Sequence, residues 1–295
     1  MGVDLDRIEK STRQLRKALK EQPGNPTADE IHDMRTHTRR LEAAVEALAL
    51  ADRHNERRLL KGLHGLRKRT GKIRDMDVFT GHAITVKVSE DERDCLVRLL
   101  ESLGAERHRH VTKLRGRMRA DGTTLRWRLK RTFDHISAAQ ANGSSSASDA
   151  FQEAAALALR LSASLAEPRR LNKSNLHPYR LKVKELRYVL QMAARPEDTI
   201  INELGKVKDA IGEWHDWEEL VSIASELNTH GPKCTLVQEL KHIAEKQYER
   251  ALVLTNRTRR EHLLSRGRDG AAASPDAIHP SPPMLAAAVG LADRR

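Results

Sequence analysis

The chain has 295 residues, with 53 Lys and Arg against 41 Asp and Glu, which gives a formal net charge of +12. Such an excess favours polyanionic partners such as nucleic acid, polyphosphate or an anionic membrane surface. Aromatic residues make up only 3% of the chain, which weighs against a protein that stacks many nucleic-acid bases. The two distant cysteines exclude a disulfide framework and a cysteine-based zinc site.

Helical periodicity dominates the first half. Met34, Leu41 and Val45 fall on one helical face, and residues 59–66 continue the pattern. The β-branched run Ile84–Val88 is the only candidate for a strand. Helical patterns return over 96–103 and 111–119, with breaks expected at Gly104 and at Asp121-Gly122.

The second half begins after a stretch rich in Gly and Ser near the midpoint. We expect residues 139–149 to form a flexible linker. Helical patterns resume over residues 150–165, 176–194, 200–209, 214–227 and 236–259. Residues 266–295 are rich in Gly, Ala, Ser and Pro, and we expect a disordered tail there. No apolar run approaches the roughly 20 residues that span a bilayer, and no signal-peptide core is evident, so we expect a cytoplasmic protein.

Two motifs recur in the same order in the two halves. Ile31-His32-Asp33-Met34-Arg35, then Arg39, matches Leu176-His177-Pro178-Tyr179-Arg180, then Lys184, at an offset of 145 residues. Gly71–Asp77 matches Gly212–Glu218 at an offset of 141, and Arg67 and Lys208 precede these segments at equal distances. Because chance rarely produces two ordered motifs at nearly one offset, the sequence predicts an internal repeat.

The first motif of each half places its basic residues in one stripe along a helix. At about 100° per residue, Arg35 and Arg39 fall near 300° and 340° relative to His32, across the helix from the apolar positions. The second copy aligns His177, Arg180, Lys184, Arg187 and Tyr188. Such a stripe destabilises a helix unless a bound anion compensates it, and arginine grips phosphate oxygens with two donors. A solvated face would explain the arginines alone, but not the repeated histidine.

Three further features have more than one interpretation. Pro178 predicts that His177 lies at a helix N-terminus, where backbone amides would add to anion affinity. Asp75 and Asp216 fit a structural role, as helix caps or as partners of basic residues. Residues 107–131 carry ten Lys or Arg and one acid around Trp127, and the cations of this region could extend a basic wall or simply face solvent.

Catalytic signatures are missing from the sequence. It has no GxxxxGK[ST] phosphate loop, no GxSxG and no HExxH, and its acids lack the spacing of a metal site. We therefore expect a binding protein and not an enzyme, with no catalytic residue, metal ligand or cofactor.

At these motifs the chain resembles the CHAD family, the conserved-histidine α-helical domain. The family's HxxRxxxRR helix is matched from His32 to Arg40, and its HxxRxxxKxxRY helix from His177 to Tyr188. Its RDxDV segment is matched by Arg74–Val78 and its LGxxxD segment by Ile211–Asp216. Glu185 and His215 depart from the first-half pattern, since they stand where the first half has Arg40 and Arg74.

The resemblance implies an all-α fold of two antiparallel four-helix bundles related by pseudo-twofold symmetry. The domain would span residues 1–265, with repeat halves at about 5–138 and 150–262. Its basic central groove would bind inorganic polyphosphate, and the protein would associate with polyphosphate granules. The expected binding residues are His32, Arg35, Arg39, Arg40, Arg67, Arg74, Arg115, Arg119, His177, Arg180, Lys184, Arg187, Tyr188 and Lys208.

Two alternatives remain open. Nucleic acid could occupy the same groove, although the scarcity of aromatic residues and the lack of a recognition helix weigh against it. An enzyme that hydrolyses polyphosphate or transfers its phosphate is the other, with the missing metal-binding acids against it. We expect no membrane partner. The sequence does not indicate an oligomeric state, a preferred polyphosphate chain length, the physiological role of binding, a role for the tail or whether the protein releases phosphate.

Overall fold

The computed structural model of the chain describes residues 5–47, 53–90, 93–141, 157–191, 198–227 and 234–264. These residues are helical apart from short connections, and none of them lies in a strand. The chain divides into two compact units at residue 147, and each unit has its own apolar core. The expected tail lies outside the described residues. Most of the expected linker does too, but its first residues belong to a helix that ends at Ala141.

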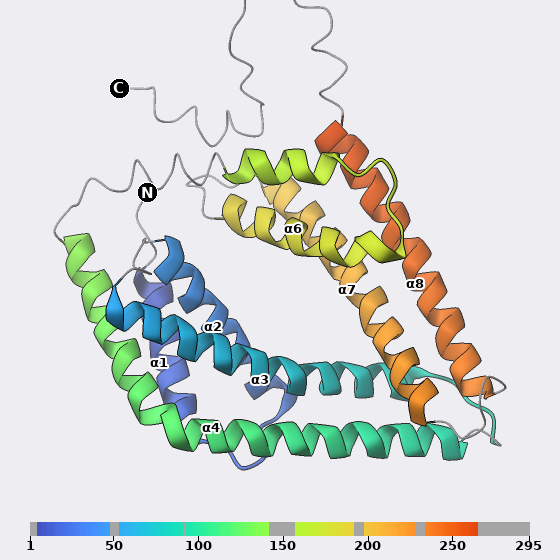
Figure 1. Cartoon of the computed structure of the whole chain (residues 1–295), viewed down its shortest axis with the longest axis horizontal. Helices are drawn as coiled ribbons and strands as arrows, with labels where there is room; N and C mark the ends of the chain where they lie inside the picture. The colour runs from blue at the N-terminus through green and yellow to red at the C-terminus, as the bar shows by residue number, and fades with distance from the viewer. Residues whose placement is uncertain are drawn as a thin grey trace, which may run out of the picture. The chain divides into compact units, whose positions relative to one another are not determined.

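The N-terminal unit is a closed ring of four helices (Figure 1). Helix α1 (Leu5–Glu21) packs against α2 (Ala28–Ala47) and α4 (Arg93–Ala141), and α3 (His54–Thr85) packs against α2 and α4. Each helix supplies an apolar stripe to the core, as the predicted face of Met34, Leu41 and Val45 does. Burying one such side chain stabilises the fold by about 1.5–3 kcal/mol.

In the C-terminal unit, residues 157–166 form the first described helix. Helix α6 (Lys173–Gln191) packs against α7 (Asp198–Leu227), which packs against α8 (Thr235–Arg259). A π-helical turn, η3 (Arg260–Leu264), continues from α8. Residues of all four α-helices share one core.

Side-chain caps set where α2 and α6 begin. Thr27 and Glu30 form a capping box, in which each backbone N–H donates to the other's side chain, at 2.7 and 3.2 Å. Asn172 accepts from the backbone N–H of Ser174 at 2.9 Å and caps α6. The cap lies a full turn before His177, so the prediction that His177 begins the helix is wrong. Pro178 lies inside α6, and its ring is exposed.

Several expected helix breaks are absent from the structure. Helix α4 runs unbroken through Gly104 and Asp121-Gly122, and α7 joins the two predicted segments 200–209 and 214–227. Gly122 is buried where α1 passes, since a Cβ there would come 3.4 Å from the Leu19 carbonyl oxygen. Close packing therefore explains this glycine better than a turn does. The candidate strand Ile84–Val88 is also wrong, because α3 continues to Thr85 and coil follows.

Two helices of each unit extend beyond its core cluster. The N-terminal cluster takes residues from α3 only up to Ile73 and from α4 only from Val111 onwards. With 49 residues α4 is about 74 Å long, whereas α1, with 17 residues, is about 26 Å long. The C-terminal cluster likewise draws on α7 up to Trp214 and on α8 from Tyr248.

Candidate functional site

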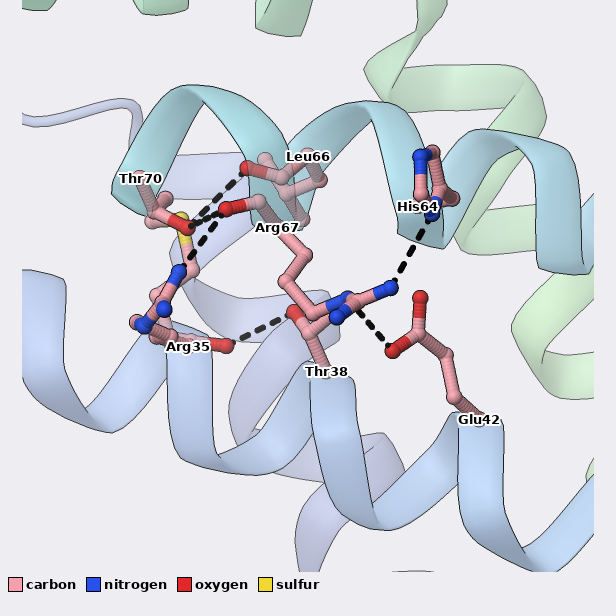
Figure 2. Close-up of polar contacts among 8 residues, drawn as sticks. Arg35, Thr38, Glu42, His64, Leu66, Arg67 and Thr70 are labelled. Carbon is pink, nitrogen blue, oxygen red and sulfur yellow. Dashed lines mark hydrogen bonds and ion pairs between the residues drawn. The ribbon is translucent and has the colours of Figure 1, made fainter. Parts of the chain in front are cut away.

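Helices α2 and α3 meet at an arginine and a glycine. Arg35 Nη1 donates to the Arg67 carbonyl oxygen at 3.1 Å (Figure 2), and its guanidinium lies against Gly71. A Cβ on Gly71 would come 2.6 Å from Arg35 Nη1, closer than atoms can approach without a shift. The predicted site residue Arg35 is therefore bonded to the backbone of the neighbouring helix, and this bond holds its charge in place.

The same contact recurs between α6 and α7. Arg180 Nε donates to the Lys208 carbonyl oxygen at 3.1 Å, and a Cβ on Gly212 would come 2.7 Å from Arg180 Nη2. These residues are the repeat counterparts of Arg35, Arg67 and Gly71, at the offsets of 145 and 141 found in the sequence. The caps correspond too, since Asn172 follows Thr27 by 145 residues. Each unit thus pairs the two motif-bearing helices in one antiparallel register.

Continued along each helix pair, this antiparallel register assigns the other predicted residues to facing positions. We call each pair of facing positions a layer. Counting along the two helices from the Arg35–Gly71 contact pairs the position of His32 with that of Arg74, and the position of Arg39 with that of Arg67. In the second unit the same count pairs the position of His177 with that of His215, whose rings are in contact, and the position of Lys184 with that of Lys208. Each helix pair therefore carries a layer with histidine, a layer in which an arginine packs on glycine, and a layer with two cations.

A fourth layer differs between the units. Figure 2 shows Glu42 of α2 facing Arg67 of α3, with Arg67 Nε 2.8 Å from Glu42 Oε2 and Arg67 Nη2 3.0 Å from His64 Nδ1. The counterpart of Glu42 is Arg187, whose Nε donates to the Ile201 carbonyl oxygen at 3.2 Å. In the first unit Glu42 thus partly neutralises the charge of Arg67, a predicted phosphate-binding residue. In the second unit Arg187 adds a cation at the position equivalent to Glu42.

In the second unit, the histidine layer consists of two neighbouring imidazole rings, those of His177 and His215. The ring centroids of His177 and His215 lie 4.2 Å apart, and His177 Nδ1 is buried with no hydrogen-bond partner in the described residues. Burial lowers the pKa of His177, and the neighbouring His215 and Arg180 lower it further, while Glu219 opposes them. A bound anion would reverse this balance because it favours the imidazolium form.

The remaining predicted residues differ in exposure. Arg39 is half-buried, and its Nε has no acceptor within the described segments. His32 and Arg40 are exposed, while Arg74 and Lys184 are half-buried. Lys208 forms an ion pair with Asp209. The side chain of Tyr188 lies outside the described residues.

Two predicted residues lie away from these helix pairs. Arg115 and Arg119 are on α4, which packs against α1 and α3, and no described contact brings them to the α2–α3 layers. Asp75 and Asp216 lie inside α3 and α7, so the capping alternative is wrong for both, and the alternative of pairing with basic residues stays a prediction.

Sequence reasoning missed the structural roles of several residues. Gly71 and Gly212 give Arg35 and Arg180 room, and their equal positions in the two motifs were the available signal. Asp77 binds Arg107, Nε to Oδ1 at 2.6 Å, and the same guanidinium donates to the Pro26 carbonyl oxygen at 2.6 Å. No sequence pattern indicated this link between α3, α4 and the start of α2.

Comparison with known proteins gives one match. A family model described as the CHAD domain matches residues 9–225, about three quarters of the chain. No curated protein matches the chain. Among the described residues, no three His, Cys, Asp or Glu side chains are grouped so that they could hold a metal ion. No helix in the described segments is both long and apolar enough to cross a membrane.

Proposed function

Because the chain belongs to the CHAD family, whose domain is associated with polyphosphate, we propose that this protein binds inorganic polyphosphate through the basic layers of α2–α3 and α6–α7. The observation that carries the proposal is the repetition of one cation arrangement in one helix register. A basic surface kept only for solubility has no need to repeat the contact that Arg35 and Arg180 each make with a glycine and a backbone carbonyl oxygen. A linear polyanion with identical phosphates can use such repeated sites in succession.

The residues of the different layers have different proposed roles in phosphate binding. Arg35 and Arg180, bonded to backbone carbonyl oxygens, supply fixed positive charges. Arg39 and Lys184 are half-buried at the cation layers and are the proposed direct phosphate contacts, with Arg40 at the exposed edge. Arginine offers a planar fork of donors for phosphate oxygens, and lysine a mobile point charge.

We further propose that the two units arose by duplication and form two antiparallel bundles related by a pseudo-twofold axis, with the basic layers lining a shared groove. The equal registers and the equivalent caps support the duplication. Spin labels at Arg40 and Glu185, the corresponding exposed positions, would measure the distance between the units. A single narrow distance distribution that shortens or sharpens with polyphosphate supports a shared groove, whereas a broad distribution unchanged by ligand contradicts it.

The decisive experiment is a double charge reversal. Arg39→Glu with Lys184→Glu should abolish binding of medium-chain polyphosphate in titration calorimetry while circular dichroism shows unchanged helix content. Losing two charge-assisted hydrogen bonds costs about 3 kcal/mol or more, which corresponds to more than about a hundredfold in affinity. A matched control, Arg98→Glu with Lys241→Glu, makes the same change in net charge at exposed sites on α4 and α8. Equal losses in the two variants would mean that binding depends only on net charge.

The proposal is for binding without catalysis, in the cytoplasm and on polyphosphate granules. Affinity should fall steeply with salt, since released counterions drive polyanion binding. Competition with single-stranded DNA of equal charge separates a polyphosphate groove from a nucleic-acid groove. Orthophosphate release from polyphosphate in the presence of Mg²⁺ would contradict the absence of catalysis, and a fluorescent fusion that stays off granules would contradict the localisation.

A further inference from the structure

The N-terminal unit exposes a tryptophan away from the layers described above. Trp127, on α4, is 52% exposed, whereas the other two tryptophans of the chain, Trp214 and Trp217, are 4% and 5% exposed. Single exposed apolar side chains are common on protein surfaces, so what sets Trp127 apart is the charge around its ring.

Cations surround this indole ring. The guanidinium carbon of Arg131 lies 5.3 Å from the ring centroid and that of Arg128 lies 5.8 Å from it. Arg128 also donates to Asn55 Oδ1 at 3.2 Å, which ties this part of α4 to the first turn of α3. The Trp127 patch consists of Trp127, the two arginines at its ring, Arg128 and Arg131, and the neighbouring basic residues of α4, Arg126 and Lys130.

Acids do little to neutralise the Trp127 patch. Asp134 pairs with Lys130 at 2.7 Å. The nearby Glu56 is 1% exposed and accepts hydrogen bonds from His135 and Thr132, so its charge faces inward. The surface around the indole therefore carries a net positive charge, with a flat apolar ring at its centre.

We propose that the Trp127 patch is a separate binding site for single-stranded nucleic acid, in which one base stacks on the indole and the flanking phosphates contact Arg128 and Arg131. Stacking platforms combined with cations are how proteins hold single strands without reading their sequence. Polyphosphate has no flat apolar face, so it gains nothing from an exposed indole. Double-stranded nucleic acid buries its base faces inside the helix, so it cannot stack a base on the exposed indole.

The site does not depend on the polyphosphate proposal, because it lies on α4 and shares no residue with the α2–α3 and α6–α7 layers. With a single platform it accommodates one stacked base, and most of the affinity comes from the phosphates. The site therefore contacts a short stretch of the strand, and its affinity falls with salt and depends little on the nucleotide sequence.

The chain offers a direct test, because Trp127 is its only tryptophan with more than 5% of its surface exposed. Titration of the full chain with a twelve-nucleotide poly(dT) strand should quench the solvent-exposed component of tryptophan fluorescence, and polyphosphate of matched charge should not. Trp127→Leu should abolish this quenching and weaken oligonucleotide affinity about tenfold, while polyphosphate affinity stays unchanged. Val97→Ala, which trims another exposed apolar residue of α4, should leave both unchanged.

Three results would overturn the proposal. The first is equal oligonucleotide affinity in Trp127→Leu and wild type. The second is complete loss of oligonucleotide binding in Arg39→Glu with Lys184→Glu, which would place the strand in the basic layers instead. The third is equal quenching of Trp127 by poly-glutamate or anionic vesicles, which would identify a general acidic partner. If polyphosphate fails to bind while the strand still quenches Trp127, the polyphosphate proposal fails and this one stands.

Discussion

Substituting alanine at Gly71 tests whether the packing of arginine on glycine holds α2 against α3. All three atoms nearest to a Cβ at this position belong to the Arg35 guanidinium, the closest at 2.6 Å. The new methyl would therefore displace the guanidinium from the Arg67 carbonyl oxygen. Alanine gains about 1 kcal/mol over glycine inside a helix, but a hydrogen bond from a charged donor is worth about 1.5–3 kcal/mol. Gly71→Ala should thus lower the free energy of unfolding by about 0.5–2 kcal/mol.

Gly65, on the same helix, supplies the control. A Cβ there meets no atom within 4 Å, so Gly65→Ala should raise the free energy of unfolding by up to about 1 kcal/mol. Urea unfolding followed by circular dichroism, with an unchanged m-value, measures both variants. In an Arg35→Met background the penalty of Gly71→Ala should disappear, because the obstructing guanidinium is gone. The reasoning fails if Gly71→Ala is as stable as Gly65→Ala, or if the penalty persists without Arg35.

Three further predictions concern pH. The folded-state pKa of His177 lies below 6.5, so the unfolded chain takes up a proton at this residue as pH falls through 6.5, whereas the folded chain does not. The urea midpoint of wild type should therefore fall further between pH 7 and pH 6 than that of His177→Gln. Equal falls in the two proteins would refute the lowered pKa of His177. Calorimetry in buffers of different ionisation enthalpy should also show proton uptake when polyphosphate binds near pH 6.5, reduced in His177→Gln. For Glu56, burial raises the pKa, but hydrogen bonds from His135, Asn55 and Thr132 outweigh it and hold the pKa below 4.5. Its ionised form thus adds stability above pH 4.5 that is lost as pH falls through the folded-state pKa. Glu56→Gln should cost about 1–3 kcal/mol in urea unfolding at pH 7 and less near pH 3, and an equal cost at both pH values would contradict the ionised role.

The helical fold class was predictable from the periodic placement of apolar residues along the chain. The apolar face of Met34, Leu41 and Val45 and the offsets of the two motifs led to an all-helical protein with an internal repeat, and the family model agrees with the resemblance. The glycines misled the prediction of helix breaks. Gly122 marks a close approach between helices, and no local pattern distinguishes a glycine kept for a neighbour from one kept for a turn.

The candidate site was predictable as a set of positions and not as a set of contacts. Sequence spacing aligned Arg35 with Arg39, but a helical wheel cannot show that Arg35 bonds across to the backbone of α3. It also gave no sign that Glu42 faces Arg67, because the two are 25 residues apart and the register of α2 on α3 decides their encounter. The place of His177 within α6 depended on the cap at Asn172, which the prediction based on Pro178 overlooked.

The ring of helices in the N-terminal unit is closed by the packing of α1 against α4, the first and last helices of the unit in chain order. Helix α1 is held to α4 where Gln22 Nε2 donates to the Met118 carbonyl oxygen, 96 residues later in the chain. During synthesis at about 5–20 residues per second, the face of α1 that meets α4 stays without its partner for roughly 5–20 seconds after α1 has been made. Its apolar residues Leu15 and Leu19, buried in the folded unit, remain uncovered on that side in the meantime. In the interval between α1 and the second half of α4, this face of the nascent chain is therefore open to chaperones and to misassociation.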